Sequence, residues 1–189
     1  MSIPLLVTRT HDMVLEFLNT IAQAKEGDTD PLGTDEDAIR WFATIGILQG
    51  DLLDHQEWVG VASEARVLRE VIGTLLKQRL DRQDVEIEKL NHFLRVSSYR
   101  VELVEKDDET LHSARKFDSG SATQALSPIA LAAAELLANA DFRRVRMCDG
   151  DACIIWFYDR TKAQRRRWCN TTLCGNRPKV GRVRVGAGQ

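Results

Sequence analysis

Residues 148–177 read CDGDACIIWFYDRTKAQRRRWCNTTLCGNR, and this stretch decides how the C-terminal quarter of the chain folds. It holds all four cysteines of the 189-residue chain as two pairs with the same internal spacing of four residues. Zinc takes four tetrahedral ligands and binds thiolate readily, so two short-range pairs can hold one ion from opposite sides. The spacing therefore predicts a structural Zn²⁺ site whose ligands are Cys148, Cys153, Cys169 and Cys174.

Other uses of the four thiols fit this pattern less well. Disulfides are disfavoured in a cytosolic chain, and isolated buried cysteines would not cluster as two matched pairs. An iron–sulfur cluster would use the same thiolates, but the spacing differs from the ferredoxin runs. None of the four histidines of the sequence lies in this segment, so the predicted ligand set is all cysteine.

Charge divides the chain at the same place. Residues 1–141 carry 14 Lys and Arg against 25 Asp and Glu, a net of −11, whereas residues 142–189 carry 12 against 3, a net of +9. Such asymmetry suggests different partners for the two parts, and a polyanion is the natural partner of the basic one. We therefore expect two domains, over residues 1–141 and 142–189.

Hydrophobic periodicity predicts that the acidic part is mainly helical. Apolar residues recur at helical spacing over residues 11–24, 63–80 and 84–96. The period then changes to two, because residues 99–105 and 110–117 alternate on either side of a polar turn. Alternation about a short polar turn is typical of a β-hairpin. The N-terminal part is therefore predicted to be a helical domain with one small hairpin.

Capping signals place two further helices. Thr34, with Asp37 three residues later, predicts the N-cap of a short helix that Gly46 can end. Ser127 followed by Pro128 predicts the N-cap and the first turn of an alanine-rich helix.

The segment between and after the cysteine pairs predicts a small irregular domain. Ile154 to Tyr158 is β-prone and can form one side of a hairpin, after which residues 159–167 return the chain to the second pair. That second pair can open a short helix, which Pro178 and Gly181 limit. A bound metal supplying about 10 kcal/mol explains how a segment with little core can be ordered. The predicted fold class is mainly α, with a helical N-terminal domain, a small β-hairpin and a C-terminal treble-clef-like four-cysteine zinc finger.

Two motifs resemble known families. Arg166-Arg167-Trp168-Cys169, followed by Cys174-Gly175-Asn176-Arg177, resembles the CGNR zinc finger, which is named for that tetrapeptide. In that family the finger usually follows a helical domain called ABATE, whose proteins are regarded as stress-related transcription regulators. Residues 16–20, Glu-Phe-Leu-Asn-Thr, are similar to the Asp-Phe-Val-Asn-Thr signature of that domain, and residues 43–48 resemble its following segment. The resemblance implies a zinc-containing transcription regulator.

The chain also departs from the family pattern. Family fingers tend to continue past the tetrapeptide as a basic helix, whereas this chain has Pro178 and Gly181 there. Asn170 stands where serine is usual after the third cysteine. These departures weaken the expectation of a long recognition helix and leave the expected metal site unaffected.

Duplex DNA is the partner that the basic segment favours. Guanidinium groups suit phosphate recognition, and asparagine and arginine can read adenine and guanine edges. The predicted nucleic-acid-binding residues are Arg160, Lys162, Arg165, Arg166, Arg167, Asn176, Arg177, Lys179 and Arg182. Structural roles stay open for three members of the tetrapeptide: Gly175 lets the backbone approach the thiolates, Asn176 caps a turn, and Arg177 pairs with Asp159.

Several further expectations follow. A protein-interaction zinc module that docks an acidic partner, including the chain's own acidic domain, is the alternative to DNA binding. No enzyme is expected, because four thiolates close the open position that catalytic zinc keeps.

Asn19, Trp41 and Trp58 could line a pocket for a small-molecule effector, although core or turn roles suit each. A homodimer would suit paired DNA half-sites. The sequence lacks a leader and a membrane-spanning apolar run, so we expect a cytoplasmic protein.

Overall fold

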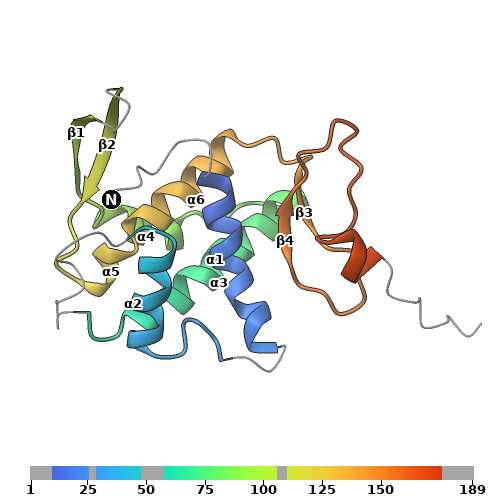
Figure 1. The fold of residues 1–189 in the computed structure, drawn as a ribbon, viewed down its shortest axis with the longest axis horizontal. Coiled ribbons are helices and arrows are strands. Elements are labelled where there is room, and N and C mark those ends of the chain that lie inside the picture. Colours follow the sequence, from blue (N-terminus) through green and yellow to red (C-terminus); the bar gives the residue numbers. More distant parts are fainter. Residues whose placement is uncertain (1–9, 26–28, 48–57, 106–109, 176–189) are drawn as a thin grey trace, which may run out of the picture.

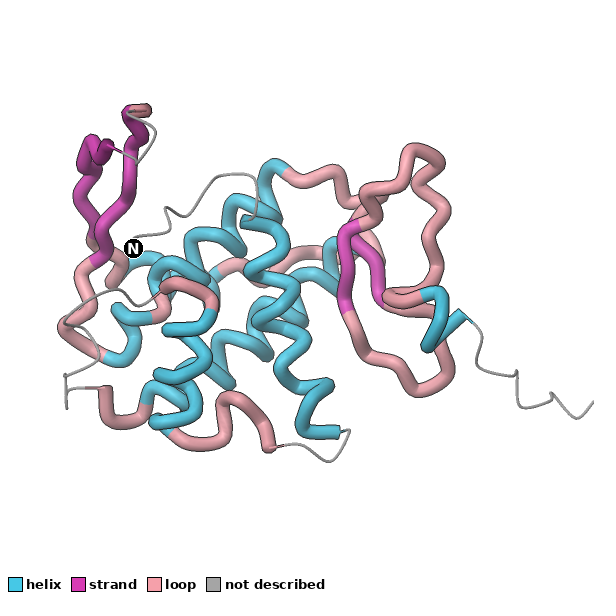
Figure 2. Tube along the Cα trace, in the orientation of Figure 1, coloured by secondary structure: helices cyan, strands magenta, loops and turns pink. Residues whose placement is uncertain are grey.

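The computed structural model describes residues 10–25, 29–47, 58–105 and 110–175 (Figure 1). In chain order, their elements are α1 (Thr10–Lys25), α2 (Asp35–Thr44), α3 (Val61–Leu80), α4 (Glu88–Arg95), β1 (Tyr99–Glu105), β2 (Leu111–Phe117), α5 (Ala122–Ala125), α6 (Ser127–Asn139), β3 (Val145–Met147), β4 (Trp156–Tyr158) and a short π-helical turn, η3 (Thr171–Gly175). Helices form the middle of the molecule, with one hairpin at each end (Figure 2). The predicted fold class is confirmed. Within the described residues, no helix is long and apolar enough to cross a bilayer.

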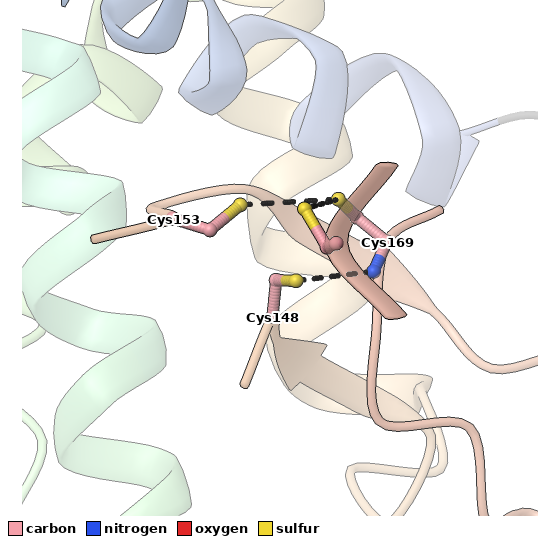
Figure 3. Close-up of side chains that lie close together, drawn as sticks. Cys148, Cys153 and Cys169 are labelled. Atoms are coloured by element: carbon pink, nitrogen blue, oxygen red, sulfur yellow. Dashed lines mark hydrogen bonds between the residues drawn. The ribbon is translucent and has the colours of Figure 1, made fainter. Parts of the chain in front are cut away.

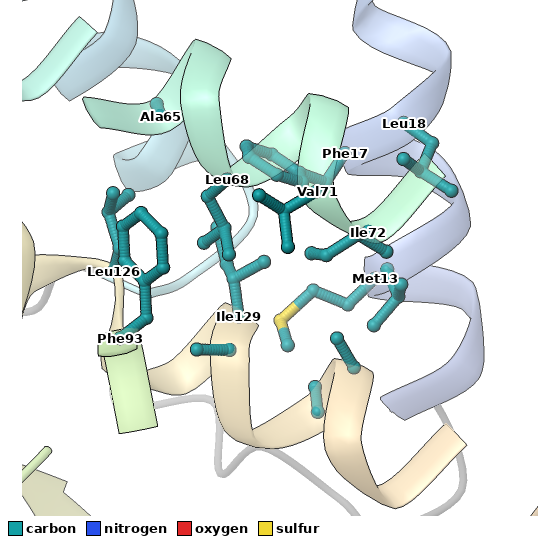
Figure 4. Close-up of a cluster of buried hydrophobic side chains, with 14 of the residues drawn as sticks. Met13, Phe17, Leu18, Ala65, Leu68, Val71, Ile72, Phe93, Leu126 and Ile129 are labelled. Atoms are coloured by element: carbon teal, nitrogen blue, oxygen red, sulfur yellow. The ribbon is translucent and has the colours of Figure 1, made fainter. Parts of the chain in front are cut away.

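The core lies where α1, α3 and α6 meet (Figure 4), and buried side chains of α2, α4 and α5 join it. It is mainly aliphatic, as a chain with 6% aromatic residues would suggest. Leu68 and Ile72 of α3 and Ile129 of α6 are fully buried. Trp58 is also buried in this core, and its indole N–H donates to the carbonyl of Ser119 at 2.9 Å. Trp41 packs its ring against the rings of its neighbours Phe17 and Phe42.

Local capping signals explain some helix boundaries and mislead at others. The predicted N-cap at Thr34 is confirmed, since its side chain accepts from the Asp37 N–H at 3.2 Å. The predicted N-cap at Ser127 is wrong. Ser127 is the first residue of α6 and Leu126 is its N-cap, and the buried Ser127 hydroxyl has no hydrogen-bond partner within the described residues. The cap signal lies earlier, because Ser121 accepts from the Gln124 N–H and begins the short helix α5.

The predicted helix over residues 84–96 begins later than the periodicity suggested. Its start is wrong, because α4 begins at Glu88. The preceding backbone makes other bonds: the Glu86 N–H donates to the Gln78 side chain at 3.1 Å, and the Ile87 N–H donates to the Val85 carbonyl at 3.0 Å. These bonds hold the chain in a turn after α3, and apolar spacing alone does not encode them.

A buried polar network ties α1 and α3 to the loop before α2. Arg69 of α3 is almost wholly buried and donates from both terminal nitrogens to Asp30, at 2.9 and 2.8 Å. It also donates to the Thr20 hydroxyl at 2.7 Å. The pKa of Asp30 is lowered, chiefly because its carboxylate accepts from Arg69. Asp30 therefore pairs with a positive charge that would be costly to bury without a partner.

The C-terminal segment packs directly on the helical domain. β3 pairs antiparallel with β4, with Val145 opposite Tyr158 and Met147 opposite Trp156. The prediction that residues 154–158 form one side of a hairpin is confirmed, and the first cysteine pair lies in the connection between the two paired strands. β4 lies along α1, and Val145 and Trp156 are buried as part of the core of the helical domain.

Candidate metal centre

The four cysteines reach one place from three short segments. Cys148 directly follows β3, and its N–H donates to the Ile155 carbonyl at 2.9 Å, which continues the hairpin. Cys153 lies in the turn before β4, and its N–H donates to the Gly150 carbonyl at 3.0 Å. Cys169 ends the loop that follows β4, and Cys174 lies in η3. Strand pairing therefore positions the first two thiols, while a loop and a helical turn position the others.

The Asn170 side chain orders the turn that carries Cys174. Its Oδ1 accepts from the N–H groups of Thr172 at 2.8 Å and Leu173 at 3.2 Å, as a capping residue does. Serine, the residue usual at this position in the family, could cap in the same way. The departure at Asn170 therefore preserves the local structure.

The sulfur atoms form one compact cluster (Figure 3). All four Sγ atoms lie within 4.8 Å of one another. The Cys169 Sγ lies 3.8 Å from that of Cys153 and 3.6 Å from that of Cys174. A tetrahedral zinc site with bonds of about 2.3 Å places its sulfurs about 3.8 Å apart. The arrangement therefore fits a four-thiolate metal site, and none of the cysteines is in a disulfide.

Backbone donors surround one thiol of the cluster. The N–H groups of Gly150 and Cys169 point at the Cys148 Sγ, at 3.4 and 3.2 Å. Burial raises the pKa of the Cys148 thiol, but these two donors, together with hydrogen bonds from the thiols of Cys169 and Cys153, outweigh burial and bring the pKa below its ordinary value. Burial raises the pKa of Cys169 and of Cys174. Metal binding to such a set must release protons, so metal affinity should fall in acid.

A glycine packs tightly against the cluster, at a different position from the one predicted. A Cβ on Gly150 would lie 3.1 Å from the Cβ of Cys174 and 3.3 Å from that of Cys153. A Cβ on Gly175 would instead meet the side chains of Thr171 and Trp168 at 3.4 Å. The contacts at Gly175 therefore do not support the interpretation that this glycine lets the backbone approach the thiolates. Gly150 is the glycine that packs tightly against the ligand cysteines.

Asp159 organises the loop between β4 and the second cysteine pair. Its carboxylate is fully buried and accepts from the N–H and hydroxyl of Thr161 at 2.9 and 2.6 Å and from the Arg166 N–H at 2.9 Å. The hydrogen bonds from Thr161 chiefly lower the pKa of Asp159. The Nε of Arg146 lies 3.9 Å from the Oδ2 of Asp159. The sequence prediction named only Arg177 as its partner, and Arg177 lies outside the described residues.

Three of the predicted DNA-contacting arginines make bonds inside the molecule. The Nη2 of Arg160 donates to both carboxylate oxygens of Asp12 of α1, at 2.6 and 2.7 Å. Arg166 is half-buried: it stacks on the Phe157 ring at 4.8 Å and donates to the carbonyls of Trp168 and Cys169. Arg167 pairs with Asp149 at 2.8 Å. Arg166 therefore braces the backbone beside a metal-site cysteine.

The other predicted contact residues fall into two groups. Lys162 and Arg165 are exposed, and no ion pair is found for either among the described residues. The remaining four lie outside the described residues: Asn176, Arg177, Lys179 and Arg182. Among the predicted contact residues that the structure describes, Lys162 and Arg165 are therefore the exposed cations without an ion pair.

Asn19 joins the finger to the helical domain, a role that sequence reasoning missed. Its side-chain amide donates to the Trp156 carbonyl at 2.9 Å and accepts from the Trp156 N–H at 2.8 Å, so it pairs with the outer edge of β4. These residues are 137 positions apart. The His11 ring packs on Tyr158 beside them. Asn19 belongs to the ABATE-like signature, and that signature was the one signal that could have found it.

Comparison with known proteins places both parts of the chain. Residues 11–140 match the ABATE family, described as "Putative stress-induced transcription regulator", and residues 144–185 match the CGNR zinc finger. Because the first match covers more than half of the chain, the chain belongs to the ABATE family, and it carries a CGNR zinc finger at its C-terminal side. Both resemblances seen in the sequence are confirmed. No curated protein matches the chain. Neither family is described as an enzyme family.

Proposed function

We propose that this chain is a zinc-containing transcription regulator that binds duplex DNA through the finger in residues 142–189, with the helical domain, residues 1–141, serving regulation, ligand sensing or dimerisation. One observation carries the proposal: four clustered thiols shape a segment whose net charge is +9. Four bound thiolates and one Zn²⁺ would leave that segment at +7, so it stays basic. The site is complete with four protein ligands, which suits a structural ion.

The proposed DNA-facing surface starts from two exposed cations of the finger. Lys162 and Arg165 lie in the loop that the buried Asp159 holds in shape, so their positions depend on the fold of the finger. They would contact phosphates, which position a protein on the duplex without reading its sequence. Base reading would fall to Asn176 and Arg177, whose side chains have the chemistry for it.

A salt series on the full zinc-loaded chain tests the proposal. Each phosphate neutralised contributes about −0.9 to the slope of log affinity against log salt. The double variant Lys162→Ala/Arg165→Ala should therefore make the slope shallower by about two and weaken binding to every duplex sequence. Fluorescence anisotropy with a labelled mixed-sequence duplex measures both quantities.

The matched control removes the same charge from the helical domain. Lys77 and Lys89 are exposed on α3 and α4, and the double variant Lys77→Ala/Lys89→Ala should leave the slope unchanged. Removing the metal with a chelator should unfold the finger and therefore abolish binding to the duplex. If the zinc-loaded chain binds no duplex at low salt, or both double variants change the slope equally, the proposal fails.

The alternative function is a zinc module that docks an acidic protein surface. The contact of Arg160 with Asp12 supports it, because a basic residue of the finger already lies on the acidic domain. Under this alternative the finger binds no DNA, and a labelled acidic peptide binds with a dependence on Lys162 and Arg165. The same two double variants separate the functions when both ligands are tested.

A further inference from the structure

The β1–β2 hairpin projects from the helical domain at the end of the molecule opposite the finger (Figure 1). Its two strands pair only with each other within the described residues. Apolar side chains on one face are open to solvent: Val101 is 64% exposed and Leu103 is 70% exposed. Tyr99 follows on the same face nearer the base, with its ring against Phe117. An isolated two-stranded hairpin is marginal in water, so an apolar face of this kind calls for a partner.

The bonding pattern shows which backbone groups of β1 point outward. The Asp118 N–H donates to the Ser98 carbonyl at 2.9 Å, and Tyr99 lies directly opposite Phe117. Bonded and non-bonded pairs alternate along an antiparallel ladder. The backbone groups of Arg100 and Glu102 therefore face β2, whereas those of Tyr99, Val101 and Leu103 face away. The outer edge of β1 thus offers a row of donors and acceptors in register with its apolar side chains.

The sequence of β1 is complementary to itself when run in the opposite direction. In an antiparallel pairing of two β1 strands centred on Val101, each Arg100 lies opposite the second copy's Glu102. Each Tyr99 then lies opposite the second copy's Leu103. Directly opposite residues share a face, so the charged pairs collect on one face and the apolar pairs on the other. The backbone groups of Tyr99, Val101 and Leu103 face outward, so these residues can form the hydrogen bonds that edge pairing requires.

We propose that two copies of this chain pair through their β1 edges into a four-stranded antiparallel sheet. A two-fold contact of this kind uses the same patch on both copies. The sequence between β1 and β2, residues 106–109, reads Lys-Asp-Asp-Glu and is acidic, which disfavours a nucleic acid as the occupant of this surface. The finger lies at the far end of the long axis, so the contact leaves it open. The proposal does not depend on DNA binding.

Charge exchange in the full chain tests the proposal. Arg100→Glu places two acidic residues opposite each other across the contact, and Glu102→Arg places two basic ones. Each change acts twice in a symmetric dimer, so each should weaken self-association by roughly tenfold or more. Mixing the two variants should restore the affinity, because opposite charges would again face each other at both positions of the contact. Sedimentation equilibrium measures association, and circular dichroism checks that each variant is folded.

Rescue by mixing separates the dimer contact from a role inside one hairpin. Arg100 and Glu102 also pair within the same strand at 2.8 Å, and Lys116 joins them. Loss of those internal pairs cannot be repaired by a second chain. The double variant Arg100→Glu/Glu102→Arg should dimerise by itself. A monomeric wild-type chain at every concentration tested, or a dimer that neither single variant weakens, would overturn the proposal, as would a mixture that fails to reassociate.

Discussion

The helical domain and the finger solve the problem of folding in different ways. In the helical domain, side chains from several helices fill one continuous apolar core, and the polar network of Arg69, Asp30 and Thr20 is an addition to it. In the finger, few apolar side chains are buried, and those of Val145 and Trp156 belong to the core of the helical domain. Its loop is shaped by Asp159 and by the four thiols. One part is stabilised by burial, the other by ligands and hydrogen bonds.

This difference predicts that the two parts respond to different perturbations. A core is weakened by deleting volume, whereas a metal-shaped segment is weakened by removing an ion or a ligand. The contact through Asn19 is where the two responses should couple. Each of the following experiments either separates the two parts or measures the link between them.

Metal removal should give the largest effect. A structural zinc ion supplies apparent folding energy of about 10 kcal/mol, so the chelated chain or a Cys169→Ser variant should lose the fold of the finger. Hydrogen exchange resolved by peptide should show fast exchange over residues 145–175 and unchanged protection in α3 and α6. Thr172→Ala is the control, because Thr172 is exposed and offers no thiol. Continued protection of the finger without metal would contradict the comparison.

Shortening a buried side chain in the core should destabilise the helical domain and leave the metal site unchanged. Leu68 is fully buried in α3, and Leu68→Ala should lower the free energy of unfolding by about 2–5 kcal/mol. Its neighbour Val67 is 48% exposed, so Val67→Ala should cost well under about 1 kcal/mol. Urea titration followed by circular dichroism measures both, and metal content should stay the same in both variants. A loss of metal from the folded Leu68→Ala chain would show that the parts are not separable in this way.

The sequence predicts the two parts with unequal success for a physical reason. Helix faces and the Thr34 cap are local patterns, so they predict α1, α2 and α3 closely. The thiol cluster could be predicted because metal ligands must be of particular residue types at close spacing. The hydrogen bonds of Asn19 with Trp156 could not be predicted, because the local sequence around Asn19 carries no information about a partner 137 residues away. The same holds for Asp159: a lone acidic residue in a basic loop does not reveal that it is fully buried.

Acid should weaken the helical domain through Asp30. Its pKa is lowered, chiefly by the hydrogen bonds from Arg69. A depressed pKa gives stability that is present above the unfolded value of about 3.9 and is lost as pH falls through the folded value. Asp30→Asn should therefore cost about 1–3 kcal/mol at neutral pH. That difference should shrink below about pH 4.

Unfolding curves at several pH values measure this effect, with Glu36→Gln as the control, since Glu36 is exposed on α2. An Asp30→Asn deficit that stays constant down to strong acid would show that the carboxylate charge has no part in it.

The link between the parts should give the smallest effect of the four. Asn19→Ala removes both side-chain hydrogen bonds to the Trp156 backbone and leaves a half-buried N–H and carbonyl without them. The expected loss is about 1–2 kcal/mol, reduced slightly because alanine favours the helix. Asn91→Ala in α4 gains the same propensity, loses only a long 3.5 Å bond to Glu88, and serves as the control. Hydrogen exchange should rise in β4, including the Trp156 amide, and stay unchanged in α3. Because the thiol cluster lies beyond this contact, metal affinity should change little; a large fall would mean that α1 helps to shape the metal site.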